Sequence, residues 1–243
     1  MAVDFLLYNL QLYKLKSMQA VILAAGRGKR MGKLTVATTK PMLKIKGKPI
    51  LEHKLNALPK KIKEIIFIVG YHSMHIISHF KHCYNGRRII YVFQSSLNGT
   101  GGALHLAKSI LRDKFLVMMG DDLYHKKDLE EMLKYDLAIM GHKVSDSSSF
   151  GMIKDNGKGL MLDVVEKPKN SRHKLANTGV YMLNRNFFDY ELVLIGKGEF
   201  GLPQTLASMA AQHKIKVHTA RAWHPIGNAE DLKKAEEIIQ TFL

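Results

Sequence analysis

Cysteine and long apolar runs are almost missing from this sequence of 243 residues. The single cysteine, Cys83, cannot form an intramolecular disulfide, which predicts a reducing, cytoplasmic setting. No apolar run approaches the ~18 residues that a transmembrane helix needs, so we expect no membrane partner. Apolar residues make up 46% and charged residues 24% of the chain, which is typical of a globular protein and excludes a disordered one.

An excess of basic residues is the most unusual feature of the composition. The chain has 37 Lys plus Arg against 21 Asp plus Glu, for a formal net charge of +16. Such a charge indicates an anionic partner: nucleic acid, an anionic membrane or a phosphorylated small molecule. Only 8 of these cations are Arg, and no helix-turn-helix, zinc-finger or RNA-recognition pattern is present. We therefore expect no nucleic-acid partner.

The chain is predicted to consist of an N-terminal extension, residues 1–17, and one α/β domain, residues 18–243. From Met18 onward, short β-branched apolar runs alternate with helical stretches, which predicts a mainly parallel central sheet flanked by helices. The predicted strands are 19–23, 65–69, 89–93, 115–119, 137–140, 151–154, 160–166, 179–183 and 215–219. The predicted helices are 50–58, 74–82, 103–111, 128–133, 202–212 and 229–242.

Four histidines lie in or beside the second predicted helix: His72, His75, His79 and His82. Their spacing of three, four and three residues places them on one face of a helix. We interpret them as a polar face, with a zinc site as the alternative.

A glycine-rich loop follows the first predicted strand. Gly26, Gly28 and Gly32 are mixed with Arg and Lys residues in this loop. Glycine lets the backbone approach a phosphate closely, and nearby cations neutralise it. The spacing G-x-G-x-x-x-G differs from the dinucleotide fingerprint, and Leu34 after Lys33 replaces the Ser or Thr of a Walker loop. The loop therefore predicts phosphate binding, but it matches neither of those two motifs.

The loop resembles the signature of the sugar-1-phosphate nucleotidylyltransferases, also called nucleoside-diphosphate-sugar pyrophosphorylases. That signature reads LAAGxGxRM, a short variable run and KPM. Here LAAGRGKRM spans residues 23–31, KPML spans 40–43 and GKPIL spans 47–51. The resemblance covers about residues 18–243. It implies a Rossmann-like (GT-A-like) fold, with residues 18–145 as the nucleotide-binding half and 146–243 as the sugar-binding half and closing helix.

The resemblance implies that the first half binds an NTP. Arg30 and Lys40 match the catalytic cations that offset charge on the triphosphate. The stretch QSSLNGTGG, residues 94–102, resembles the base-reading segment of the family. The implied nucleotide-binding residues are Leu23, Ala24, Ala25, Gly26, Gly28, Gln94, Gly99 and Thr100.

A magnesium site is implied at the end of the fourth predicted strand. Asp121 of MMGDD matches the metal-binding, catalytic Asp of the family, and a hard cation with oxygen ligands suits a triphosphate. The family commonly has a second metal-binding Asp in Trp-x-Asp-x-Gly, where this chain has Pro225. We expect the amide of Asn228 to be the substitute ligand, with helix capping as its alternative role; His224 is the next candidate.

The second half carries the implied sugar site. Lys167 is the implied catalytic cation for the sugar phosphate, while Glu166 and Asn177 suit sugar hydroxyls. The implied sugar-binding residues are Gly151, Glu166, Asn177 and Thr178.

The implied reaction joins an NTP to a sugar 1-phosphate, releasing pyrophosphate and an NDP-sugar, with Mg²⁺ as cofactor. Gln94 and the Gly99–Thr100 pair favour UTP or dTTP, and we expect a sugar of the glucose-1-phosphate type. The alternatives are a GTP-dependent mannose-1-phosphate enzyme, a cytidylyltransferase for a phosphorylated alcohol, and a non-catalytic homologue that binds nucleotide sugar. The sequence leaves a homo-oligomer open.

Overall fold

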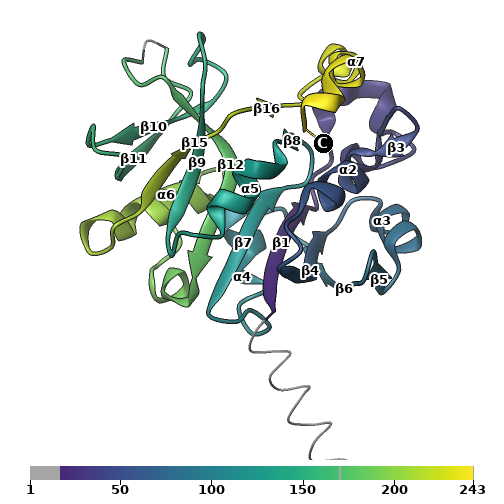
Figure 1. Ribbon diagram of the computed structural model, residues 1–243, viewed down its shortest axis with the longest axis horizontal. Coiled ribbons are helices and arrows are strands. Elements are labelled where there is room, and N and C mark those ends of the chain that lie inside the picture. Colours follow the sequence, from purple (N-terminus) through teal and green to yellow (C-terminus); the bar gives the residue numbers. More distant parts are fainter. Residues whose placement is uncertain (1–16, 170, 243) are drawn as a thin grey trace, which may run out of the picture.

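A ten-stranded mixed sheet forms the centre of the computed structural model, which describes residues 17–169 and 171–242 (Figure 1). Its strands are β1 (Met18–Ala24), β4 (Ile62–Val69), β5 (Cys83–Tyr84), β6 (Arg87–Phe93), β7 (Lys114–Met119), β9 (Ala138–Lys143), β10 (Gly151–Asp155), β11 (Met161–Glu166), β12 (Leu175–Asn184) and β15 (Lys216–Thr219). The strand order is β11-β10-β12-β7-β1-β4-β6-β5, and β9 pairs with both β12 and β15.

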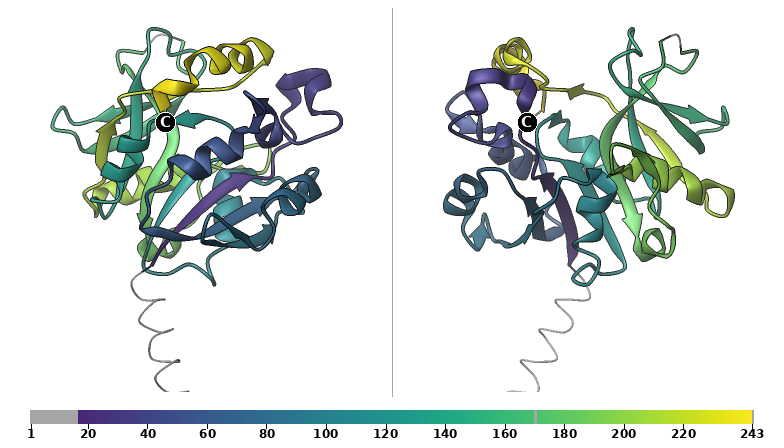
Figure 2. Two further views of the ribbon diagram at one scale, coloured as in Figure 1. Left: turned by 45° about the vertical axis from the view of Figure 1, so that its right-hand side comes forward. Right: turned by 180° about the vertical axis from the view of Figure 1, so that it is seen from behind.

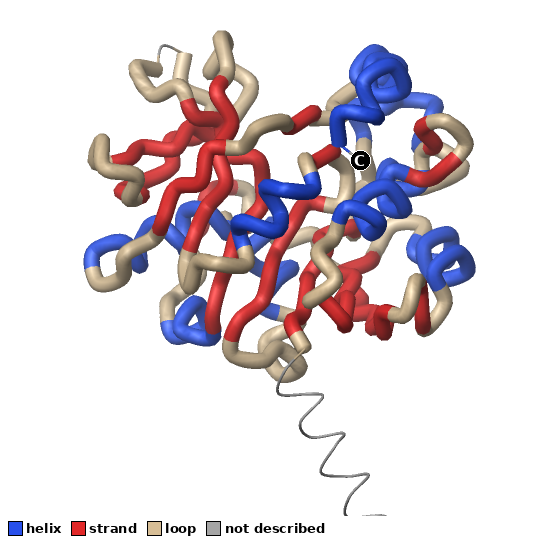
Figure 3. Tube along the Cα trace, in the orientation of Figure 1, coloured by secondary structure: helices blue, strands red, loops and turns tan. Residues whose placement is uncertain are grey.

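Helices and three small two-stranded sheets surround this central sheet (Figure 3). The α-helices are α2 (Ile50–Ala57), α3 (Ser73–Phe80), α4 (Gly99–His105), α5 (Lys126–Met132), α6 (Leu202–Ser208) and α7 (Ala229–Ile238). The 3-10 segments are Lys29–Thr35, Lys40–Met42, Arg185–Asp189, Met209–Ala211 and Ile239–Phe242. The small sheets pair β2 (Lys44–Ile45) with β3 (Lys48–Pro49), β8 (Leu123–Tyr124) with β16 (Trp223–His224), and β13 (Leu194–Gly196) with β14 (Glu199–Phe200).

Strand β1 is the centre of a parallel block. It pairs in parallel with β4 on one side and with β7 on the other, and β4 pairs in parallel with β6. The chain therefore extends the sheet outward to β6 and then returns to the opposite side of β1. In open α/β sheets, ligands bind beyond the carboxyl ends of the strands at such a reversal. Beyond β7, β12 pairs antiparallel with β7, β9 and β10.

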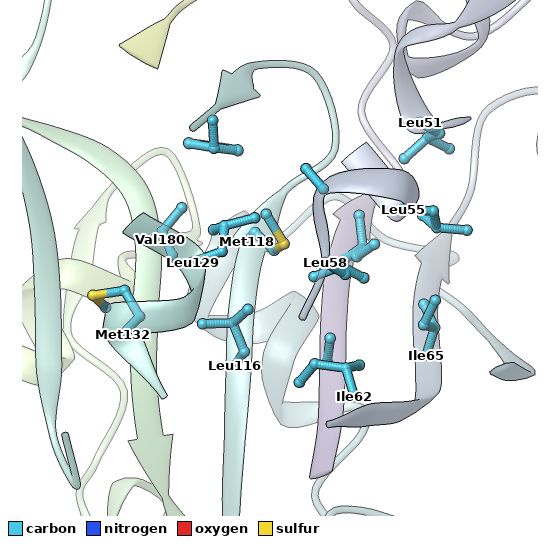
Figure 4. Packing of buried hydrophobic residues seen from close by; sticks show 14 of the residues in the cluster. Leu51, Leu55, Leu58, Ile62, Ile65, Leu116, Met118, Leu129, Met132 and Val180 are labelled. Atoms are coloured by element: carbon cyan, nitrogen blue, oxygen red, sulfur yellow. The ribbon is translucent and has the colours of Figure 1, made fainter. Parts of the chain in front are cut away.

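Alternate residues of the central strands pack on opposite faces of the sheet. In β1, Ala20 and Ile22 belong to one buried cluster, whereas Val21 belongs to another. Helices α2, α3 and α5 contribute to the first cluster, and α4 and α6 contribute to the second. Figure 4 shows part of the first cluster, where Leu129 of α5 lies beside Met118 of β7. Each such buried side chain stabilises the fold by about 1.5–3 kcal/mol, so both faces support the central strands.

A third buried cluster joins the two ends of the described chain. Met31, Leu43 and Ile50 come from the region after the glycine-rich loop, while Ile226 and Phe242 come from the C-terminal region. Helix α7 accordingly contacts β2, and the yellow C-terminal helix lies near the purple N-terminal part of the chain in Figures 1 and 2. The C-terminal region thereby packs against the segment that carries the phosphate-binding signature.

All nine predicted strands are present, with ends shifted by a few residues. The prediction of a helix over 103–111 is wrong, because α4 spans Gly99–His105 and turns follow it. Three glycines within α4 argue against a helix by intrinsic propensity. Packing favours glycine here, since a Cβ on Gly101 would lie 3.2 Å from Phe200 O and one on Gly102 would overlap the Asn98 side chain.

Two predictions of domain organisation are not resolved by the fold. Except for Ser17, the extension over 1–17 lies outside the described residues. The division near residue 145 stays a prediction, because one sheet contains strands from both halves and β12 pairs directly with β7. Within the described ranges, no helix is both long and apolar enough to cross a membrane.

Candidate active site

The glycine-rich loop and Asp121 meet where the strand order reverses. Gly120 follows β7, and its N–H donates to Leu23 O at 2.9 Å. A Cβ on Gly120 would also lie 2.9 Å from this oxygen, so a side chain there would push β1 and β7 apart. The close approach of the two strand ends places Asp121 directly beside the loop.

The loop folds tightly around two glycines in left-handed conformations. Gly28, with φ 63°, precedes the 3-10 segment Lys29–Thr35, and Gly32, with φ 54° and ψ −127°, kinks that segment. The Thr35 hydroxyl donates to Gly28 O at 3.2 Å and so ties the two ends of the segment together. A Cβ on Gly28 would lie 2.9 Å from Cβ of Lys40. The stem of Lys40 therefore packs directly on the loop.

A cavity of 350 Å³ opens beside β1. Its lining includes all eight residues that the sequence predicts to bind nucleotide. Apolar side chains and glycine backbone form most of its wall, as suits the flat apolar faces and polar edge of a nucleobase. The lining residues are Leu23, Ala24, Ala25, Gly26, Gly28, Lys40, Pro41, Gln94, Leu97, Gly99, Thr100, Ala103, Met119, Asp121, Ile195 and Glu199.

Gln94 supplies a fixed polar group to this cavity. The side chain is 7% exposed, and its Nε2 donates to Asn98 Oδ1 at 2.9 Å. No described residue donates to its Oε1, which leaves this oxygen as an acceptor for a ligand N–H. Gly99, with φ 89°, lies against Phe200, and a Cβ there would overlap the Phe200 backbone. The base-reading segment is therefore held by glycine contacts as well as by its own hydrogen bond.

A second cavity, of 270 Å³, adjoins the first. Gly28, Lys40 and Asp121 line both cavities, so the two are neighbours at these residues. The second is strongly cationic, and its further lining consists of Lys29, Arg30, Met31 and Gly227. Arg30 and Lys40, which come from opposite ends of the signature, thus meet Asp121 across one space. Such a concentration of positive charge beside an apolar cavity suits a triphosphate attached to a nucleoside.

Lys40 and Asp121 form an ion pair at the junction of the two cavities. The distance from Nζ of Lys40 to Oδ2 of Asp121 is 2.6 Å. The Lys40 side chain is 8% exposed, whereas that of Asp121 is 34% exposed. The carboxylate therefore remains accessible to a ligand while its charge is balanced by a buried ammonium.

A second Lys–Asp set lies beside this pair, with Lys54 buried and Asp122 half-buried. Lys54 Nζ donates to Asp122 O at 2.6 Å and lies 4.1 Å from the centre of the Tyr124 ring. Burial lowers the pKa of Lys54 and raises the pKa of Asp122, although each charge favours ionisation of the other. The Asp122 carboxylate accepts hydrogen bonds from Trp223 Nε1 at 3.0 Å and Ile226 N at 3.3 Å. Asp122 thus holds the segment that carries Pro225 against the site.

The donor groups near Asp121 fit a magnesium ion that is shared with substrate. Mg²⁺ in nucleotide sites is usually bound by one or two carboxylates together with phosphate oxygens. Asp121 supplies one accessible carboxylate, and the part of the chain described by the structure has no group of three or more His, Cys, Asp or Glu arranged to hold a metal. Asn228 is the N-cap of α7: its Oδ1 accepts from Asp231 N at 2.9 Å, and the Asp231 carboxylate accepts from Asn228 N at 3.1 Å. This capping box engages the amide oxygen that was expected to bind the metal.

Three predicted sugar-site residues lie where β10 and β11 pair. Gly151 is the register partner of Glu166, and a Cβ on Gly151 would lie 2.9 Å from Glu166 Oε2. Lys167 follows with φ 41°, and its Nζ lies 3.9 Å from Glu166 Oε1. Both charged side chains are more than half exposed. They are therefore available to a ligand, although none of the three lines the 350 Å³ cavity.

Asn177 and Thr178 lie on β12 and make internal contacts. Asn177 Nδ2 donates to Tyr181 Oη at 2.8 Å, and its Oδ1 accepts from Gly179 N at 3.0 Å. Thr178 is 1% exposed, and its hydroxyl donates to Met140 O at 2.9 Å. The Thr178 side chain is thus engaged inside the sheet, whereas Asn177 is partly exposed.

The hairpin of β13 and β14 contributes residues that sequence reasoning missed. Ile195 and Glu199 line the nucleoside-sized cavity opposite the glycine-rich loop, together with Leu97 of the base-reading segment. The signal for the hairpin is the sequence Gly196-Lys-Gly198 between short apolar stretches, since both glycines have positive φ, at 113° and 74°. Nothing in the sequence indicated that this hairpin would face β1.

Substitution of Asn228 tests whether this residue stabilises the fold as the N-cap of α7. We expect Asn228→Ala to lower the free energy of unfolding by about 1 kcal/mol, because the first turn of α7 loses its side-chain acceptor. Asn228→Ser should retain most of the stability. Denaturant unfolding measures both, with Asn186→Ala, an exposed asparagine elsewhere, as the control. Equal stability of the Ala variant and the wild type would contradict the capping role.

Comparison with known proteins places this site in a family. A model described as nucleotidyl transferase matches residues 19–241. The bifunctional protein GlmU of Methanocaldococcus jannaschii is 32% identical over 91% of this chain and 54% of its own length. The UTP–glucose-1-phosphate uridylyltransferase AglF of Haloferax volcanii is 29% identical over 92% of this chain and 97% of its own length. This chain thus spans about half the length of the GlmU relative and nearly all of AglF.

Solved structures show the same fold. The UDP-glucose pyrophosphorylase of Acinetobacter baumanii superposes with a TM-score of 0.80 at 20% identity, over 90% of this chain and 92% of that one. The likeness confirms the predicted GT-A-like fold, with its mixed sheet and flanking helices. The family match confirms the resemblance carried by the glycine-rich signature. The chain belongs to the nucleotidyl transferase family.

Proposed function

We propose that this chain is a sugar-1-phosphate nucleotidylyltransferase that uses UTP or dTTP and a sugar of the glucose-1-phosphate type. One observation carries the proposal: an apolar cavity with a free glutamine acceptor lies next to a cationic cavity, and Gly28, Lys40 and Asp121 line both. A nucleoside in the first cavity would extend its triphosphate into the second. The near full-length likeness to a protein named as a UTP–glucose-1-phosphate uridylyltransferase supports the same choice.

The proposed reaction is an in-line displacement at the α-phosphorus of the NTP. A phosphate oxygen of the sugar 1-phosphate forms the new P–O bond, the bond to the bridging oxygen of the β-phosphate breaks, and pyrophosphate leaves with that electron pair. The nucleophile is already an anion, so no general base is required. Arg30 and Lys40 bind the triphosphate and neutralise charge on the leaving pyrophosphate. Bound Mg²⁺ would supply further charge neutralisation at Asp121 and the phosphates.

Base selection is proposed to depend on Gln94. Its Nε2 is engaged by Asn98, which orients Oε1 as the acceptor. The N3–H of uracil or thymine is a suitable donor, and its two neighbouring carbonyls can accept from backbone N–H groups of the glycine-rich segments. A free Oε1 alone does not exclude guanine, whose N1–H is also a donor. The base is therefore assigned jointly from this geometry and the likeness to the uridylyltransferase.

The sugar is proposed to bind beside the paired Gly151 and Glu166. Glu166 and Asn177 would contact sugar hydroxyls, and Lys167 would contact the sugar phosphate. Gly151 keeps the surface open, because a side chain there would meet the Glu166 carboxylate. Thr178 would support this wall from within β12, since its hydroxyl is already engaged.

A matrix of NTPs against sugar 1-phosphates tests the proposed function. We expect pyrophosphate release to be fastest with UTP or dTTP and glucose 1-phosphate or a close analogue, and to require Mg²⁺. The measurement is the rate of pyrophosphate release under saturating substrates. Preference for GTP with mannose 1-phosphate, or for CTP with phosphocholine, would contradict the substrate assignment. Binding of UDP-sugar without turnover of any pair would favour the non-catalytic alternative that Pro225 suggests.

Removal of individual charges tests the roles of the signature residues. We expect Arg30→Ala and Asp121→Ala each to lower kcat by about 10²–10³-fold, because each removes fixed charge acting on the reacting phosphates. Lys33→Ala and Asp146→Ala are the matched controls, since both side chains are exposed and line neither cavity. Near wild-type turnover by either active-site variant at saturating UTP and Mg²⁺ would show that its role is assigned wrongly.

A further inference from the structure

The run between the two halves of the signature is held by few apolar contacts. This run, Leu34–Thr39, connects the 3-10 segment that carries Arg30 to Lys40. Leu34 is 42% exposed and Val36 is 69% exposed, so neither side chain fixes the run by burial. Polar contacts must therefore supply most of what holds it in place.

Those contacts come from the connection between β4 and α3 and from the first turn of α3. His72 Nε2 lies 2.9 Å from Val36 O, and His75 Nδ1 lies 2.9 Å from Thr38 Oγ1. A carbonyl oxygen only accepts, so the Nε2 atom of His72 carries the hydrogen and donates it. The Tyr71 hydroxyl adds a weaker contact to Thr35 O at 3.3 Å. Three residues of the run, Thr35, Val36 and Thr38, are thus contacted by side chains of residues 71–75.

The contacting side chains are themselves held in place. Tyr71 N donates to Ala25 O at 3.2 Å, which fixes this connection to the start of the glycine-rich loop. His72 has left-handed backbone dihedrals, φ 50° and ψ 36°, which are uncommon for a residue other than glycine. The rings of His72 and His75 stack with centroids 5.5 Å apart and an interplanar angle of 6°. The two imidazoles therefore present their nitrogens to the run as one unit, which we name the histidine pair.

The other histidines of this region do not take part. His79 Nε2 lies 3.1 Å from Glu52 Oε2 of α2, and His82 lies beyond the end of α3. The sequence prediction of one polar face is therefore refined by the structure: the histidine pair contacts the loop, whereas His79 contacts a neighbouring helix. His79 can therefore serve as the control for substitutions in the histidine pair.

We propose that the histidine pair positions the two catalytic cations. His72 holds Val36, next to Thr35, whose hydroxyl donates to Gly28 O and so fixes the segment bearing Arg30. His75 holds Thr38, two residues before Lys40. Neither imidazole lines the two cavities, so both are positioning residues and not catalytic ones. The inference rests on the proposed function for its link to NTP binding.

The test combines kinetics with a measurement that needs no activity. In the full chain, the double variant that carries both His72→Ala and His75→Ala should raise KM for UTP about fivefold to tenfold. We expect little change in kcat, because two modest hydrogen bonds order the loop before NTP binds. Trypsin should also cleave the loop faster, at Arg27, Lys29, Arg30 or Lys33. His72→Gln and His75→Asn, whose amides can replace the Nε2 and Nδ1 atoms, should restore the wild-type values. His79→Ala is the matched control and should change neither value.

A double-mutant cycle of Thr38 and His75 tests the contact without changing His72, whose backbone conformation is unusual. Thr38→Val removes the partner of His75 without altering α3, and it should raise KM as much as His75→Ala does. The combined variant, Thr38→Val with His75→Ala, should have a KM no higher than that of either single variant. Independent, additive effects, or an unchanged KM and cleavage rate in the histidine double variant, would overturn the proposal. Faster cleavage with an unchanged KM would also overturn the positioning role. Absence of turnover by the wild type would instead refute the proposed function, while the cleavage rates would still test the contacts.

Discussion

The ion pair between Lys40 and Asp121 is the interaction on which the site depends. Lys40 comes from the end of the signature and Asp121 from the end of β7, and they meet only because Gly120 lets β7 approach β1 closely. The Lys40 ammonium is buried, whereas the Asp121 carboxylate is partly exposed where the two cavities meet. Binding of NTP and Mg²⁺ would have to exchange this contact, with Lys40 moving to phosphate and Asp121 to the metal. Lys40 and Asp121 thus balance each other before substrate binds, while Lys29 and Arg30 leave the cavity cationic.

The C-terminal region closes the same site from the other side. Asp122 holds the segment around Pro225, and Gly227 lines the cationic cavity. Where the resemblance implies a second metal-binding carboxylate, this chain has Pro225 and, three residues later, the helix cap Asn228. Among the described residues, Asp121 is then the carboxylate that we propose for the metal. In the proposed function the triphosphate would supply most of the metal ligands, so we expect metal binding to depend on nucleotide.

Much of the fold, and of the cavity that we propose for the nucleotide, could be predicted from sequence, because local patterns determine them. The apolar runs gave each predicted strand, and the signature located the residues around β1 and Lys40. Long-range packing determined the rest. Helix α4 begins among glycines because Phe200 and Asn98 crowd it. The hairpin residues Ile195 and Glu199 enter the cavity only through the tertiary fold, and the capping contact of Asn228 depends on where α7 starts.

Binding of Mn²⁺, as a substitute for Mg²⁺, tests the central claim most directly. Equilibrium dialysis would compare the metal retained by the chain with and without UTP, using Asp121→Ala as the reference. The account predicts about one Mn²⁺ per chain in the presence of UTP, and little without it, since one carboxylate paired with Lys40 is a poor metal site by itself. Equally tight binding of Mn²⁺ without nucleotide, or retention by Asp121→Ala, would contradict the account.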